Sequence, residues 1–191
     1  MLVLVLPVQA GTLRVEVRDD ADRPLPEAVV FLESAQARRQ VRPTEGAEMG
    51  QAGRQFVPQV LVVSTGTEVS FPNRDTVRHH VYSFSPVKKF ELKLYIGTPT
   101  KPVLFDQPGI AVLGCNIHDQ MVGWIVIVDT PYFGRTTEKG LLVLDRLPPG
   151  SYRLRSWHAG LPVGAPALDQ AVSVPAEGQL DVSVRMTGVR P

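Results

Sequence analysis

The sequence has little cysteine, little net charge and no long apolar run. Its 191 residues include 1 cysteine, 20 Lys and Arg, and 19 Asp and Glu, so the formal net charge is +1. A single cysteine excludes an internal disulfide, and nucleic-acid binding would require a concentrated basic surface. No segment reaches the roughly 18 apolar residues of a membrane-spanning helix. The composition therefore argues against three classes: disulfide-rich proteins, nucleic-acid-binding proteins and helical membrane proteins.

The sequence also lacks any sustained helical period. Its 17 prolines and 16 glycines divide many short runs rich in Val, Leu and Ile. Short strands bounded by turn residues are typical of an all-β chain. We expect the strands at 11–18 and 28–32 to pair as a hairpin across a polar turn. Residues 34–54 show no periodicity and are predicted to be a linker.

Residues 1–10 are predicted to be the end of a secretory signal peptide. They carry no charge, and Val8-Gln9-Ala10 offers a cleavage site. The basic start of such a signal is missing, so it is truncated or begins upstream. The alternative is an apolar first strand, which Pro7 would interrupt. Secretion would place the protein in the periplasm, where a lone thiol needs a role other than an internal disulfide, such as metal ligation.

The single cysteine lies between two apolar runs, in a short segment of potential metal ligands. Cys115 is followed by His118 and then Met121, at intervals of three residues. A thiol, an imidazole and a thioether on one turn suit a soft metal ion, above all copper. A further ligand must come from another strand, and the adjacent His79 and His80 are available. Strand alternation places these two on opposite faces, so only one of them can face the turn.

Residues 55–129 resemble a cupredoxin, the blue copper fold, and most of all its amicyanin branch. The likeness lies in a glycine-to-asparagine stretch, 66–73, followed six residues later by a histidine, and in the Cys-x-x-His-x-x-Met loop. It implies a Greek-key β-sandwich that holds one type 1 copper ion. The ligands implied by the resemblance are His79, Cys115, His118 and Met121. Residues that would steady these ligands, or replace one of them, are His80, Asn73 and Asn116. His80 stands where the family usually has asparagine, which leaves open which histidine is the ligand.

Residues 11–33 and 130–188 resemble two parts of a transthyretin-like domain, also described as carboxypeptidase regulatory-like. The likeness rests on Arg-Pro-Leu-Pro-Glu-Ala-Val-Val at 23–30 and Leu-Pro-Pro-Gly-Ser-Tyr at 147–152. The cupredoxin would then be inserted into a smaller transthyretin-like or Ig-like β-sandwich, since the ends of a sandwich lie close together. Alternatively, the first hairpin belongs to the cupredoxin and the C-terminal part stands alone.

The leading hypothesis is a periplasmic one-electron carrier that cycles between Cu(II) and Cu(I). We do not expect an enzyme, because no Ser/His/Asp set or carboxylate pair has a hydrolytic spacing. The amicyanin likeness extends to methylamine-utilisation proteins, which implies a cytochrome c or a quinoprotein dehydrogenase as redox partner in amine oxidation. The alternatives are a copper-delivery protein without redox turnover and a β-sandwich interaction module without a metal. Zinc is a weaker choice of metal, since a thioether adds little to a zinc site.

Overall fold

The computed structural model describes residues 10–190, which form two compact units. The first unit holds the chain up to Ser34, Tyr132–Leu161 and the chain from Ala167, and the second holds Ala35–Pro131 and Pro162–Pro166. Apart from its last residue, the expected signal peptide at 1–10 lies outside the described residues.

Nearly all regular structure in the described part of the chain is β-strand. The helix found there, α1 (Ala35–Arg38), has only four residues. No helix within residues 10–190 is long and apolar enough to cross a membrane. The prediction of an all-β chain is confirmed.

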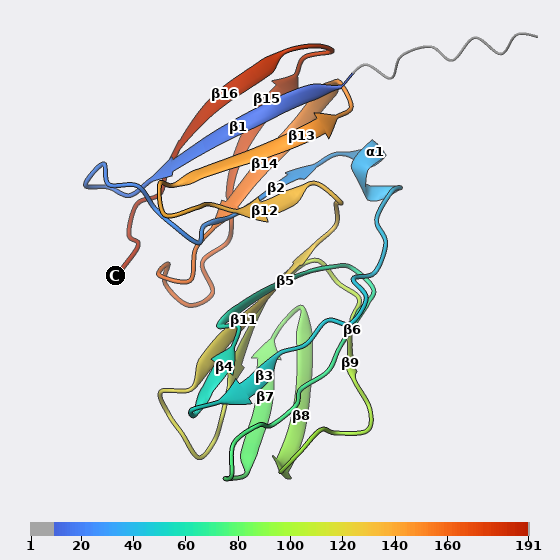
Figure 1. The fold of residues 1–191 in the computed structure, drawn as a ribbon, viewed down its shortest axis with the longest axis vertical. Coiled ribbons are helices and arrows are strands. Elements are labelled where there is room, and N and C mark those ends of the chain that lie inside the picture. The colour runs from blue at the N-terminus through green and yellow to red at the C-terminus, as the bar shows by residue number, and fades with distance from the viewer. Residues whose placement is uncertain (1–9, 191) are drawn as a thin grey trace, which may run out of the picture. The chain divides into compact units, whose positions relative to one another are not determined.

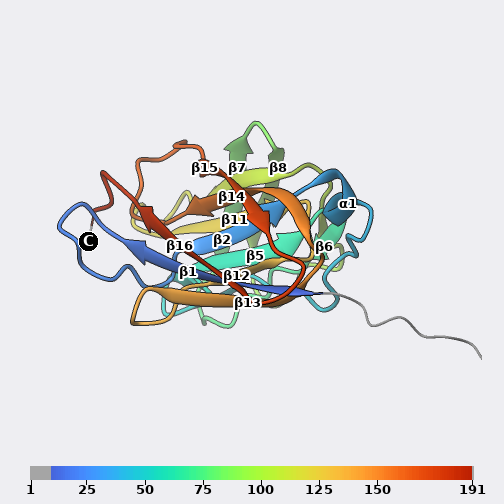
Figure 2. The same ribbon diagram turned by 90° about the horizontal axis from the view of Figure 1, so that it is seen from above.

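Strands from both ends of the sequence build the first unit, as the blue and orange-red ribbons of Figure 1 show. They are β1 (Gly11–Arg18), β2 (Val29–Glu33), β12 (Phe133–Arg135), β13 (Leu141–Leu147), β14 (Gly150–Trp157), β15 (Leu168–Val174) and β16 (Gln179–Arg185). They form one sheet in the order β13-β1-β16 and a second in the order β12-β2-β14-β15 (Figure 2). The predicted hairpin is therefore wrong, because β1 and β2 lie in different sheets.

The pairing of β1 explains why the hairpin does not form. Leu13, Val15 and Val17 are fully buried on one face of this strand. β1 is also the central strand of its sheet, antiparallel to β13 and parallel to β16. Both backbone edges of β1 are thus satisfied by strands from the far end of the chain, and none is left for β2.

The turn between β13 and β14 is held by a tyrosine. The Tyr152 hydroxyl donates a hydrogen bond to the Pro148 carbonyl at 2.8 Å. Burial raises the pKa of Tyr152 above its ordinary value. Gly150 has a φ of 148°, a backbone conformation that favours glycine. The Leu-Pro-Pro-Gly-Ser-Tyr segment therefore forms a fixed corner of the first unit.

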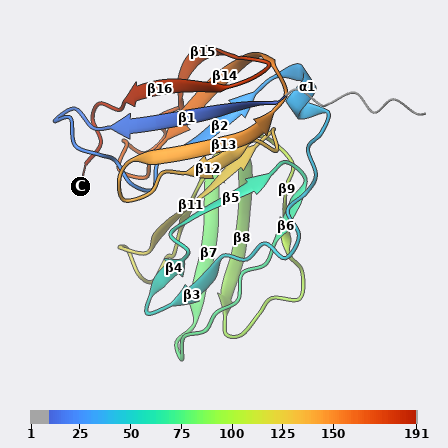
Figure 3. The same cartoon turned by 45° about the horizontal axis from the view of Figure 1, so that its top comes forward.

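The second unit contains the strands from the middle of the sequence. They are β3 (Gly50–Ala52), β4 (Gln55–Val57), β5 (Val60–Ser64), β6 (Thr67–Val69), β7 (His79–Ser85), β8 (Lys88–Tyr95), β9 (Val103–Phe105), β10 (Gly109–Gly114) and β11 (Val122–Val128). Five of them form a sheet in the order β5-β11-β10-β7-β8, while β3 pairs with β4 and β6 with β9 (Figure 3). After β8 the chain forms β9, which pairs with β6, and it then returns as β10 beside β7. This is a connection of the Greek-key kind.

An aromatic and aliphatic core fills the second unit. The Phe71 and Phe90 rings lie 5.4 Å apart, and Phe90 and Phe105 make an edge-to-face contact at 5.9 Å. Cys115 and Met121 belong to the same buried cluster. The turn that carries the proposed metal ligands is therefore seated against the core.

The segment 34–54 is not a linker. Met49 is fully buried in the core of the second unit, and the chain then forms the β3–β4 hairpin. Phe56 of β4 packs over Gly123 of β11, where an added Cβ would lie 2.9 Å from the phenylalanine ring. The periodicity is absent because the segment contains only a short helix and a three-residue strand, which are too short to produce a pattern.

We expect Phe56→Ala to lower the free energy of unfolding by about 3–5 kcal/mol, because it opens a cavity over Gly123. The neighbouring Val57 is 46% exposed, against 2% for Phe56. Val57→Ala is therefore the matched control, with an expected change below about 0.5 kcal/mol. Urea denaturation followed by tryptophan fluorescence measures both. Equal effects of the two substitutions would mean that the hairpin does not pack as described.

Candidate metal centre

Two successive tight turns connect β10 to β11 and carry the ligand-type residues of this segment. The His118 N–H donates to the Cys115 carbonyl at 3.4 Å, and the Met121 N–H donates to the His118 carbonyl at 2.9 Å. Each hydrogen bond joins residues three apart, so the chain makes one turn between Cys115 and His118 and a second between His118 and Met121. The three-residue spacing in the sequence is thus matched by the local backbone.

The pairing of β10 with β7 decides which histidine meets this turn. Gly114 lies opposite Tyr82 in the antiparallel ladder. Extending this register by one residue places Cys115 opposite Val81, and residues directly opposite one another share a face. His79 is two residues from Val81 and lies on that same face, whereas His80 lies on the other.

The side chains of His79, Cys115 and His118 come together at the end of the sheet. Their candidate ligand atoms all lie within 4.8 Å of one another. The Cys115 Sγ lies 3.8 Å from the Nδ1 of His79 and 3.8 Å from the Nδ1 of His118. The two imidazole rings are tilted, with centroids 5.0 Å apart. One thiol and two ring nitrogens therefore face a common point and can hold a metal ion.

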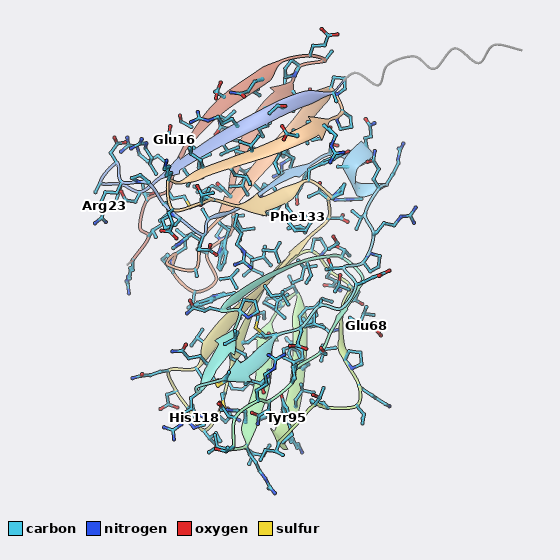
Figure 4. All side chains as sticks on the ribbon, in the orientation of Figure 1. Glu16, Arg23, Glu68, Tyr95, His118 and Phe133 are labelled. Carbon is cyan, nitrogen blue, oxygen red and sulfur yellow. The ribbon has the colours of Figure 1, made fainter. Side chains whose placement is uncertain are left out.

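The site is buried on most sides. His79 is fully buried, Cys115 and Met121 are nearly so, and His118 is partly exposed. Figure 4 labels His118, which lies at the same end of the second unit as Tyr95. Two imidazoles, one thiolate and one thioether are the donors of type 1 copper sites. His79, Cys115 and His118 supply the first three, and Met121 belongs to the same buried cluster as Cys115, so the donor set fits a copper ion.

His80 and the two asparagines lie around this site in different roles. The Asn116 amide donates to the Nδ1 of His80 at 2.6 Å. The Nε2 of His80 lies 2.9 Å from a Glu91 carboxylate oxygen, although this contact is not aligned as a hydrogen bond. Asn73 donates instead to the carbonyls of Val77 and Tyr95, at 2.9 and 3.0 Å. Asn116 thus holds His80 beside the Cys turn, and Asn73 fixes the loop that precedes β7.

Asp75 also contacts the site, although no motif in the sequence points to it. Its Oδ2 lies 2.7 Å from the Nε2 of His79. The pKa of Asp75 lies below its ordinary value because the carboxylate accepts hydrogen bonds from the Arg54 N–H, the His79 side chain and the Gly53 N–H. Burial acts in the opposite direction but does not outweigh these bonds. The sequence shows only that Asp75 lies in a polar bend, four residues before His79. That position does not predict a contact with His79 unless the fold is known.

Tyr95 and Gln51 complete the polar surroundings. The Tyr95 hydroxyl lies 2.7 Å from the Gln51 Oε1 and 2.8 Å from the Phe71 carbonyl. Burial raises the pKa of Tyr95 to about 12. Tyr95 also pairs with His79 across β7 and β8, so this neutral hydrogen-bonded group fixes the strand end that carries His79.

Comparison with known proteins gives partial structural matches. No protein-family model and no curated protein matches the sequence. The chain is similar to a Cu-containing nitrite reductase from Thermus scotoductus SA-01, with 25% identity and a TM-score of 0.41, over 46% of this chain and 23% of that one. It is similar to a purple cupredoxin from Nitrosopumilus maritimus, with 19% identity and a TM-score of 0.38, over 43% and 99% of the two chains. It is also similar to an oxidized mutant of amicyanin, with 18% identity and a TM-score of 0.40, over 52% and 98%.

Substitution of each adjacent histidine tests the geometry. His79→Ala removes a nitrogen that faces the thiol, so we expect the affinity for Cu²⁺ to fall more than about 100-fold. His80→Ala removes only a neighbour of Asn116, and we expect a loss of no more than about 10- to 100-fold, as for residues that support ligands. Competition titration with a chelator measures both affinities. The reverse order would assign the ligand to His80.

Proposed function

We propose that the second unit is a cupredoxin whose type 1 copper ion transfers single electrons between redox proteins. The proposed ligands are the Nδ1 of His79, the Sγ of Cys115, the Nδ1 of His118 and the sulfur of Met121. The observation that carries the proposal is the position of the buried Cys115 thiol 3.8 Å from a ring nitrogen of His79 and 3.8 Å from one of His118. A copper ion bound there would supply a Cu(II)/Cu(I) couple.

The residues around the site suit a carrier that changes charge without rearranging. Cys115 and Met121 lie in the packed core, and His79 is fixed at the start of β7 by Asp75 and by pairing with Tyr95. Ligands held in this way have little freedom to move when the charge at the site changes. His118 is the most exposed of the four, so its ring edge is the proposed route for electrons.

The surface near His118 supports a brief encounter with a partner. Ile117, next to this histidine, is 48% exposed. Small apolar contacts of this kind suit weak redox complexes, which bury little area. Of the basic residues in the loop before β7, Arg74 is neutralised by pairing with Glu48. Arg78, next to His79, and Lys93, near the end of β8 that pairs with His79, are exposed and could attract an acidic partner.

The cellular location, the redox partner and the role of the first unit are also proposals. We propose a periplasmic location, as residues 1–10 suggest, and a cytochrome c or quinoprotein dehydrogenase as redox partner in amine oxidation. We propose that the first unit is a transthyretin-like sandwich interrupted by the cupredoxin. Its Tyr152 corner and its strands from both ends of the sequence support that assignment. It would serve as a scaffold or docking domain, since no catalytic arrangement was found in its sequence.

Cys115→Ser tests the carrier directly. The wild-type protein loaded with Cu²⁺ should show an intense visible band from charge transfer between thiolate and Cu(II), and Cys115→Ser should abolish it, because an alcohol does not replace the thiolate. Visible absorption at increasing Cu²⁺ measures both. Tight binding of Cu(I) without the band in the wild-type protein would favour copper delivery, and no stoichiometric copper would favour an interaction module.

Met121→Leu tests whether the thioether would act as a copper ligand. The leucine has a similar volume and keeps the core filled, so we expect copper binding and colour to persist. The axial ligand tunes the reduction potential of such sites, so the potential should change. Spectroelectrochemical titration measures it, with Met49→Leu as the matched control, since Met49 is equally buried in the same core. Equal potentials in both variants would exclude Met121 as a ligand.

A further inference from the structure

The imidazole of His79 is held on the side opposite the metal site by a carboxylate. The Nε2 of His79 lies 2.7 Å from the Oδ2 of Asp75, while its Nδ1 faces the Cys115 sulfur at 3.8 Å. A carboxylate accepts hydrogen bonds, so the proton of the neutral ring must be on Nε2. This leaves the lone pair of Nδ1 directed at the point where the thiol and the second imidazole converge.

The carboxylate is itself fixed by backbone groups from another part of the chain. The Gly53 N–H donates to its Oδ1 at 2.7 Å, and the Arg54 N–H donates to its Oδ2 at 2.9 Å. Gly53 and Arg54 form the tip of the β3–β4 hairpin, and both have a φ near 60°. Positive φ at both central residues is typical of the type I′ turn of a two-residue hairpin. Here the N–H groups of both central residues point at the Asp75 side chain.

A third contact sets the position of the Asp75 backbone. Its N–H donates to the Oδ1 of Asn73 at 2.9 Å. The Asn73 amide also bonds the carbonyls of Val77 and Tyr95. The Asp75 side chain is only 15% exposed, so water screens its charge weakly. A fixed negative charge therefore lies one imidazole ring away from the metal site.

We propose that Asp75 is a positioning residue that orients His79 and lowers the reduction potential of the copper, with the β3–β4 turn as its support. The inference rests on the proposed function. A carboxylate bonded to a ligating histidine fixes its tautomer and raises its basicity. The negative charge also stabilises Cu(II), the more positive state, relative to Cu(I). The segment expected to be a linker is thus the outer part of the metal site.

The test compares Asp75→Asn with Asp106→Asn in the full chain loaded with copper. Asparagine can still accept the hydrogen bond from His79, but it carries no charge. Asp106 supplies the matched control, because it is an exposed carboxylate of the same unit that pairs with Lys88 at 3.6 Å and contacts no proposed ligand. At a fixed potential we expect Asp75→Asn to lower the Cu(II)/Cu(I) ratio about tenfold, which is a rise of about 59 mV for one electron. Asp106→Asn should stay near the wild-type value.

A second measurement does not depend on a variant that folds. Nitrogen-15 NMR of the histidine rings in the Cu(I)-loaded wild-type protein, which is diamagnetic, reports the tautomer. We expect a proton on the Nε2 of His79 that exchanges slowly with water. An unprotonated Nε2, or equal potentials for Asp75→Asn and Asp106→Asn, would overturn the role of Asp75 while leaving the carrier function intact. A wild-type protein that binds no copper would overturn the proposed function, and this inference with it.

Discussion

The close approach of β10 to β7 is the constraint on which the metal centre depends. A Cβ on Gly114 would lie 2.7 Å from the end of the Tyr82 side chain, so a larger residue here would displace the ring that covers this position. The next residue, Cys115, must then point to the opposite face, where Val81 and His79 are buried. Any shift of one residue would bring His80 to the thiol instead, since strand neighbours alternate between faces.

The core stabilises this arrangement from the inside and polar contacts stabilise it from the outside. Cys115 and Met121 pack with the aromatic and aliphatic side chains of the second unit, so two of the proposed ligands are also core residues. The two histidines complete the site from the end of the sheet. Around them, Asp75, Asn73 and Tyr95 connect β7, β8 and the β3–β4 hairpin through hydrogen bonds. Movement of one ligand would therefore disturb both the packing and this network.

The spacing of the candidate ligands could be predicted because its information is local. The three-residue intervals from Cys115 to Met121 match two consecutive turns, and the alternation of β7 correctly separates His79 from His80. Asp75 could not be found in this way. Its contact with His79 depends on the amides of Gly53 and Arg54, which precede it by about twenty residues in a segment without any periodic pattern. For the same reason, the β3–β4 hairpin could not be predicted from the sequence.

Composition and strand alternation are enough to establish the all-β class, the candidate metal ligands and the separation of His79 from His80 onto opposite faces. The tertiary structure decided which strands pair. β1 is joined by β13 and β16 from the far end of the chain, and the hairpin of 50–57 packs on β11 through Phe56 and Gly123. Strands that are far apart in the sequence pair when the pairing buries their apolar faces and gives their backbone N–H and C=O groups hydrogen-bond partners. No local pattern carries that information.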